Sequence, residues 1–194
     1  MTDPEVALMC AFARGEEAAF VTLYRTYRDR IIAYCTRLLG DRARAEEAAQ
    51  DVFIKLYGTR DTYTERGQFS SFLYRIATNH CFNLRAQLDQ RLTDRRKALD
   101  DDSHSASTRE HDPAGQLANA ELRSALAAAL AELPDKQRAA FVLVHYQELA
   151  YRDAAAALQV SEAAVKSLIH RARISMMQRL EPHARRESEV VHAM

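Results

Sequence analysis

The sequence predicts an all-α protein made of two small helical domains that are joined by a flexible linker. Apolar residues recur with a helical period over most of the chain, and alanine-rich runs are frequent. Only five glycines interrupt the 194 residues. No run of alternating β-branched residues suggests a sheet, and a hydrophobic fraction of 47% excludes wholesale disorder.

Composition divides the chain into four segments. We expect a first helical domain over residues 1–90 and a second over 116–181. Residues 91–115 are rich in Asp, Ser, Thr and His and poor in large apolar side chains, and 182–194 form a polar tail. A segment that buries little apolar surface cannot offset the entropy of ordering, so 91–115 is predicted to be a flexible linker.

The first domain has the pattern of three long helices, over about 16–39, about 43–57, and from 69 or 70 to about 88. Gly40 is the expected end of the first of these helices. A polar loop, 59–68, separates the second from the third.

The second domain has the pattern of four helices. The first two are predicted over 117–130 and from Pro134, a residue suited to a first helical position, to about Tyr146. A third helix covers Tyr151–Leu158, and the fourth begins after Ser161. Ser161 is a good N-cap, because its hydroxyl can accept a bond from the free N–H groups that open a helix.

The last two helices and the turn between them have the layout of a helix-turn-helix, whose second helix enters the DNA major groove. Gln159 stands where such turns often have glycine, and Ala154 and Ala157 stand where larger aliphatic residues would pack better. The predicted buried face of the second helix contains Val165, Ile169, Ala172 and Met176. The face predicted to contact DNA contains Ala163, Lys166, Ser167, His170, Arg171 and Arg173.

Charge and cysteine content limit the possible functions. The chain has 27 basic and 27 acidic side chains, which argues against a uniformly basic protein, but arginines gather near the C-terminal end. No apolar run approaches eighteen residues and no signal peptide is recognisable, so we expect a cytoplasmic protein without direct membrane insertion. Cys10, Cys35 and Cys81 are scattered, and we expect reduced thiols that fill the core.

The sequence offers no constellation for catalysis. The seven histidines are scattered, no His/Cys/Glu set has the spacing of metal ligands, and no glycine-rich phosphate loop precedes a helix. We therefore expect no enzyme activity, no metal and no cofactor.

Three blocks of sequence, in this order, resemble the extracytoplasmic-function group of bacterial RNA polymerase sigma factors. The blocks are AEEAAQDVFIKLY at 45–57, GQFSSFLYRIATNHCFNLRA at 67–86 and LPDKQRAAFVLVHYQELAYRDAAAALQVSEAAVKSLIHRARISM at 133–176. The resemblance implies that the first domain binds core RNA polymerase and melts the promoter −10 element, while the second reads the −35 element. It also implies an anti-sigma factor as a partner and a linker that passes through the catalytic channel.

The resemblance assigns residues to each role. Block 45–57 matches the polymerase-binding helix, whose exposed acidic and amide side chains are Glu46, Glu47, Gln50 and Asp51. Melting exposes unpaired bases, which need stacking platforms, hydrogen bonds to base edges and cations along the backbone. The residues expected to contact the −10 element are Tyr63, Arg66, Arg75, Asn79 and Arg85. Phe72 stands where many relatives have tryptophan and should preserve the packing.

Two other functions fit parts of the sequence. A stand-alone helix-turn-helix regulator with a helical sensory or dimerisation domain would bind duplex DNA without polymerase. A helical adaptor with no DNA role would tolerate charge removal over 163–173. The aromatic and arginine residues beside an acidic helix over 45–86 favour the sigma factor over both.

Overall fold

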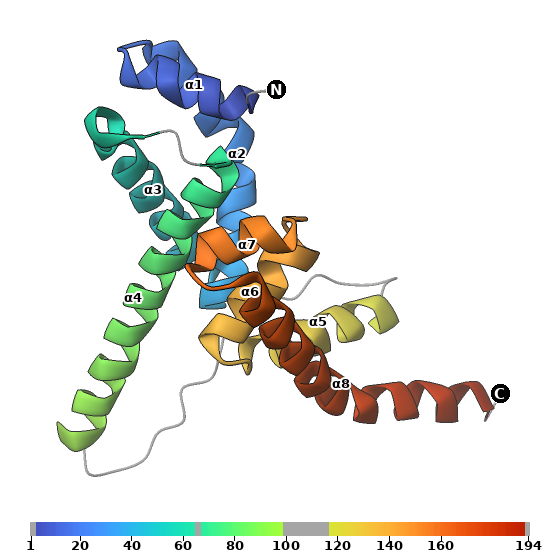
Figure 1. Ribbon diagram of the computed structural model, residues 1–194. Helices are drawn as coiled ribbons and strands as arrows, with labels where there is room; N and C mark the ends of the chain where they lie inside the picture. The colour runs from blue at the N-terminus through green and yellow to red at the C-terminus, as the bar shows by residue number, and fades with distance from the viewer. Residues whose placement is uncertain (1–2, 65–66, 99–116, 193–194) are drawn as a thin grey trace.

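The computed structural model describes residues 3–64, 67–98 and 117–192, and these residues form α-helices and one 3₁₀ turn without any strand. Figure 1 shows the helices packed around a common centre, with α4 and α8 projecting from it in different directions. In chain order the elements are α1 (Pro4–Ala13), α2 (Glu17–Leu39), α3 (Arg42–Gly58), η1 (Arg60–Thr62), α4 (Phe69–Ala98), α5 (Leu117–Ala131), α6 (Asp135–His145), α7 (Tyr151–Leu158) and α8 (Glu162–His192). The all-α prediction is confirmed.

The first domain is built on α2, which packs against α1, α3 and α4. The helix ends at Gly40, whose φ of 75° lies in the left-handed region that glycine adopts without strain. Asp41 then caps α3, because its carboxylate accepts a hydrogen bond of 3.1 Å from the Arg44 amide. The sharp turn at these two residues sets α3 beside α2, so that one face of α3 is buried and the other faces solvent.

Helix α4 is longer than its composition suggests. It continues through residues 91–98, which the sequence analysis assigned to the linker. This stretch has few apolar side chains, but Arg, Leu, Lys and Ala are good helix formers. A hydrogen bond of 3.0 Å between Gln90 and Asp94, four residues apart, gives further local support. The remaining linker residues, 99–115, lie outside the described part of the chain, and α8 likewise continues from the second domain into the expected tail.

The helix-turn-helix forms as predicted. Gln159 ends α7 in the left-handed conformation, with φ of 55° and ψ of 44°, at the position where such turns often have glycine. The Ser161 hydroxyl caps α8 by accepting a hydrogen bond of 3.1 Å from the Ala164 amide. The predicted inner face of α8, which consists of Val165, Ile169, Ala172 and Met176, is buried. Pro134 is the residue before α6 rather than its first residue.

The two domains pack directly against one another. Helix α7 lies across the first half of α4, and α6 lies against α2 (Figure 1). At their junction the Tyr74 hydroxyl donates a buried hydrogen bond of 2.6 Å to Gln147 Oε1, and Arg30 donates one of 3.1 Å to the Gln147 carbonyl. Arg85 forms an ion pair of 2.8 Å with Asp135. We call these residues, together with Arg138, the interdomain contact.

Arg138 is a buried cation at this junction, with only 2% of its surface exposed. Its guanidinium donates to the carbonyls of Leu38 (2.8 Å), Leu133 (2.9 Å) and Ala131. Burial and the neighbouring Arg85 lower the pKa of Arg138 to about 10, so the side chain remains charged at neutral pH. The charge binds carbonyls at the ends of two helices, one in each domain.

The cysteines are free thiols. Cys35 and Cys81 are buried between α2 and α4, with 3.6 Å between their sulfur atoms, while Cys10 is half-buried. The contact with Cys81 and burial both raise the pKa of Cys35, so it is a thiol rather than a reactive thiolate. Their core-filling role is confirmed for Cys35 and Cys81. Among the described residues, no helix is long and apolar enough to cross a membrane, and no group of acidic, His or Cys side chains is arranged to bind a metal.

Candidate interaction surfaces

Helix α3 presents an acidic and amide face to solvent. Ala48, Val52 and Leu56 are buried on its inner side. The outer side exposes the four residues that the sequence analysis assigned to this face: Glu46, Glu47, Gln50 and Asp51. We call these four residues the α3 acidic face.

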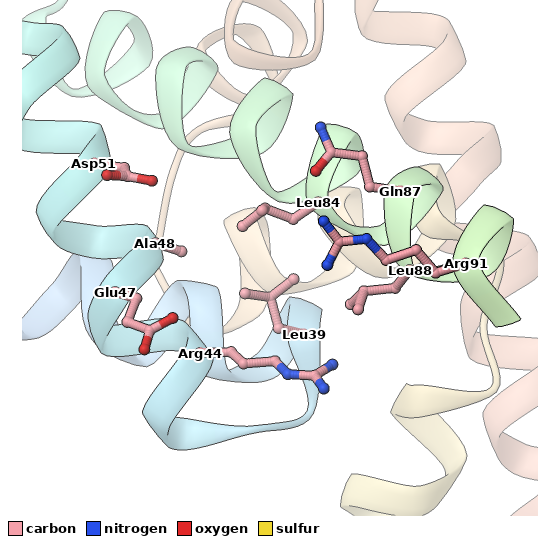
Figure 2. Close-up of a pocket in the computed structure, with 9 residues that line it drawn as sticks. All are labelled: Leu39, Arg44, Glu47, Ala48, Asp51, Leu84, Gln87, Leu88 and Arg91. Atoms are coloured by element: carbon pink, nitrogen blue, oxygen red, sulfur yellow. The ribbon is translucent and has the colours of Figure 1, made fainter.

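A groove of about 180 Å³ borders the α3 acidic face, between α3, the end of α2 and the second half of α4. Figure 2 shows side chains of α3 and α4 pointing toward one another across it. Its apolar lining consists of Leu39, Ala48, Leu84 and Leu88. Its polar lining consists of Arg44, Glu47, Asp51, Gln87 and Arg91. Sequence reasoning missed the residues from α4, because it ended that helix near 88 and could not tell which face of α4 meets α3.

A second surface gathers aromatic and arginine side chains at the start of α4. The ring of Tyr63 meets that of Phe72 edge to face at 5.3 Å, and the Arg75 guanidinium lies 5.2 Å from the centre of the Phe72 ring. These three side chains line a hollow of about 230 Å³ that also includes Ala156 of α7. Phe72 is half-buried and packs against the core.

The other residues expected at this second surface differ in their surroundings. Asn79 is exposed one turn beyond Arg75. Arg85 is instead engaged in the interdomain contact, where it pairs with Asp135 and donates a hydrogen bond of 3.0 Å to the Leu38 carbonyl. Arg66 lies outside the described residues. Tyr74, one of the aromatic side chains of this segment, is fully buried, and burial raises its pKa to about 12.

Helix α8 displays its predicted contact face. Ala163, Lys166, His170, Arg171 and Arg173 are exposed, and Ser167 between them is half-buried. Lys166 pairs with Glu162 at 3.0 Å, and Arg171 donates a hydrogen bond of 3.0 Å to the Ser167 hydroxyl. Exposed pairs of this kind contribute little stability, so the cations can exchange these partners for phosphates or base edges.

Arg173 has a different partner. Its guanidinium lies 3.1 Å from His145 Nε2 at the end of α6. Burial and the charge of Arg173 lower the pKa of His145, so the ring is neutral and can accept the hydrogen bond. The histidine thus restrains the direction of the Arg173 side chain.

Comparisons with known proteins identify the family of the chain. The family model of Sigma-70 region 2 matches residues 23–91, and that of Sigma-70 region 4 matches residues 123–185. The ECF RNA polymerase sigma factor SigW of Bacillus subtilis (strain 168) is 30% identical over 171 residues, which cover 86% of this chain and 91% of SigW.

Two solved structures have a similar fold. The structure of CnrH in complex with the cytosolic domain of CnrY has a TM-score of 0.69 at 23% identity and covers 93% of this chain and 99% of the other. The sigma factor RpoE in complex with the anti-sigma factor NepR from Bartonella quintana has a TM-score of 0.63 at 20% identity. It covers 84% of this chain and 96% of the other.

Region 2 followed by region 4 on one helical chain defines a transcription initiation factor of the sigma-70 type. The chain belongs to the extracytoplasmic-function RNA polymerase sigma factors, as its sequence motifs predicted. It is therefore a factor that binds core RNA polymerase and promoter DNA, and it is not an enzyme. Family membership sets aside the stand-alone regulator and the helical adaptor.

Proposed function

We propose that the two domains of this cytoplasmic alternative sigma factor divide the work between them, and that an anti-sigma factor keeps the protein inactive. The first domain binds core polymerase and opens the promoter at the −10 element. The second domain reads the −35 element. The observation that carries this proposal is the separation of an acidic face on α3 from a basic face on α8 within one chain.

The α3 acidic face is the proposed polymerase-binding surface. Its side chains are exposed on a helix whose opposite side is anchored in the core, so a partner would meet a rigid surface. The adjoining groove provides apolar side chains between charged ones of both signs, which suits an amphipathic helix whose polar side chains include basic ones opposite Glu47 and Asp51. Charged groups of this kind fix register and specificity more than raw affinity.

The surface around Phe72 is the proposed reader of the melted −10 element. Tyr63 and Phe72 can stack with bases, Arg75 can bind a phosphate, and Asn79 can form paired hydrogen bonds with a base edge. Arg66 and Arg85 belong to the same proposal. Arg85 would become available to DNA only after the interdomain contact opens, because it now bonds to the second domain.

Helix α8 is the proposed reader of the −35 element. Ala163 and Ser167 are small, which allows the helix to approach the floor of the major groove. We assign base-edge or mixed contacts to Lys166 and His170, and mainly phosphate contacts to Arg171 and Arg173.

The proposed anti-sigma partner is inferred from the fold. The sigma factor RpoE, which shares this fold, was solved in complex with the anti-sigma factor NepR. A protein partner that covers the polymerase-binding or promoter-binding surfaces of this chain would block its activity.

Transcription in vitro tests the function directly. Core polymerase with this protein should initiate at its cognate promoter, and core polymerase alone should not. Asp51→Arg should lower the affinity for core polymerase by about tenfold or more, because like charges opposed across an interface cost several kcal/mol.

Asp61→Arg, an equal change of charge at an exposed position in η1, serves as the control. Thermal unfolding of both variants shows whether each is folded at the temperature of the binding assay. Retention of Asp51→Arg on immobilised core polymerase at the level of the control would show that α3 is not the binding face.

A further inference from the structure

His80 of α4 stands between two charged side chains of α3. Its Nε2 atom lies 3.1 Å from Asp51 Oδ2, and its Nδ1 atom lies 2.5 Å from Lys55 Nζ. The imidazole is buried, with 8% of the residue exposed, although Asp51 and Lys55 are both exposed. A buried ring therefore joins two surface charges, one of which belongs to the α3 acidic face.

The two contacts define the tautomer of His80. A lysine ammonium has no acceptor atom, so Nδ1 must be the unprotonated nitrogen that accepts from Lys55. Burial and the charge of Lys55 lower the pKa of His80, so the ring is neutral at pH 7. The single ring proton is then on Nε2, which faces Asp51. Nε2 has no well-aligned hydrogen bond among the described residues, and the Asp51 carboxylate, 3.1 Å away, is the acceptor that faces it.

The position of His80 prevents an ion pair between Asp51 and Lys55 that α3 would otherwise favour. Asp51 and Lys55 are four residues apart with the acid on the N-terminal side, the order in which helical ion pairs form best. In the described part of the chain, Asp51 pairs with His80 and has no direct ion pair with Lys55. The imidazole occupies the position between the two charges, where it accepts from Lys55 and faces Asp51 at 3.1 Å.

We propose that His80 is a positioning residue for polymerase binding, which keeps Lys55 from neutralising Asp51. The proposal rests on the proposed role of the α3 acidic face. With His80 in place, one carboxylate oxygen of Asp51 faces a neutral ring at 3.1 Å, and the negative charge stays available at the edge of the groove, near Glu47 (Figure 2). Without the ring, the flexible lysine would fold back onto Asp51, and a basic partner would have to displace it.

A suppressor experiment tests the proposal. His80→Ala should weaken binding to core polymerase about two- to fivefold, the effect of masking a partly exposed charge with an ion pair. Lys55→Met in the His80→Ala background should restore the affinity, because methionine is a good helix former without charge. The affinity of the single Lys55→Met variant is the reference against which the affinity of the double variant is compared.

His80→Gln provides a conservative comparison, because its amide nitrogen can occupy the place of Nε2 and donate to Asp51. It should retain more affinity than His80→Ala. Thermal unfolding of every variant shows whether the protein is folded at the temperature of the binding assay. A general loss of packing at position 80 would not be repaired by removing the charge of Lys55. Restored affinity of the double variant therefore shows that His80 acts by keeping Lys55 away from Asp51, which we call its spacer role.

The outcomes separate this proposal from the proposed binding face. If Asp51→Asn weakens polymerase binding while the double variant stays as weak as His80→Ala, the spacer role is overturned and the α3 acidic face remains. Unchanged binding of Asp51→Asn would overturn both. Full affinity of His80→Ala would overturn the spacer role alone.

Discussion

At the scale of single residues, the basic side chains of α8 differ in how firmly they are placed. Lys166 pairs with Glu162, and Arg171 bonds to Ser167, each four residues away on α8. Lys166 also lies 5.9 Å from the centre of the Tyr151 ring of α7, whereas Arg173 bonds to His145 of α6. A side chain with local, exposed partners can turn toward DNA at little cost. Lys166 and Arg171 are therefore the informative positions for testing the −35 reader.

Alanine substitution should distinguish two kinds of contact on α8. Lys166→Ala should cost about 1–3 kcal/mol on the cognate −35 element and relax the preference at one base pair. Arg171→Ala should lower the affinity evenly across sequences, as loss of a phosphate contact does. Transcription from a library of −35 elements measures both effects.

Arg123→Ala, which removes an exposed arginine from α5, is the matched control for these substitutions. If Lys166→Ala and Arg171→Ala both transcribe from the library with the sequence preference and yield of the unmodified protein, α8 does not read the −35 element.

The sequence predicted which faces the site residues occupy, but not all of their partners. Helical periodicity identified the outward face of α3 and the buried face of α8, because that information is local. It could not reveal that Arg85 bonds to Leu38 of its own domain and to Asp135 of the second domain. These partners are 47 and 50 residues away in the sequence. His80 was overlooked for the same reason, because its importance comes from α3.

At the scale of elements, the turn of the helix-turn-helix combines a strained residue with a good cap. Gln159 adopts a left-handed conformation that costs a residue with a Cβ atom roughly 1 kcal/mol relative to glycine. Ser161 offsets this cost by capping α8. The turn therefore retains its geometry without the usual glycine.

We expect opposite effects from substitutions at these two positions. Ser161→Ala should lower the free energy of unfolding by about 1 kcal/mol through loss of the cap. Gln159→Gly should raise it by up to about 1 kcal/mol through relief of the left-handed conformation. Denaturant unfolding monitored by circular dichroism measures both. A stabilised Ser161→Ala variant would contradict the capping role.

The ends of α4 and α8 show where prediction from composition fails at this scale. A low content of apolar residues predicted a linker and a tail, yet both helices continue beyond the packed core. Such extensions depend on intrinsic propensity and on pairs within the helix, such as Gln90 with Asp94, rather than on buried surface.

At the scale of the whole molecule, the interdomain contact conflicts with the proposed simultaneous use of the −10 element by the first domain and the −35 element by the second. The −10 and −35 elements lie roughly 25 base pairs apart, which is about 85 Å along B-form DNA. In the structure α7 packs on α4 itself, and Ala156 lies at the hollow beside Phe72. The proposed division of work between the domains therefore requires them to separate on a promoter.

Fluorescence energy transfer between the domains should report this separation. Dyes would be attached at the exposed positions Asn83 and Met177. The efficiency of energy transfer between them should be high in the free protein and should fall when the protein binds core polymerase and promoter DNA. Gln147→Ala removes the acceptor of the Tyr74 hydroxyl and should lower transfer in the free protein. An efficiency that stays the same in the initiation complex would show that the domains remain packed.

The packed domains have a consequence for competition between sigma factors. Polymerase that accepts only separated domains captures this chain with an apparent affinity reduced by the fraction of molecules that are open, so each 1.4 kcal/mol of domain packing costs tenfold. A substitution at Gln147 or Arg138 would then change the share of polymerase that this chain recruits when several factors compete for a limited supply. Neither residue belongs to the proposed polymerase-binding or promoter-binding surfaces. Expression of the target genes would therefore depend on the stability of the interdomain contact as well as on those surfaces.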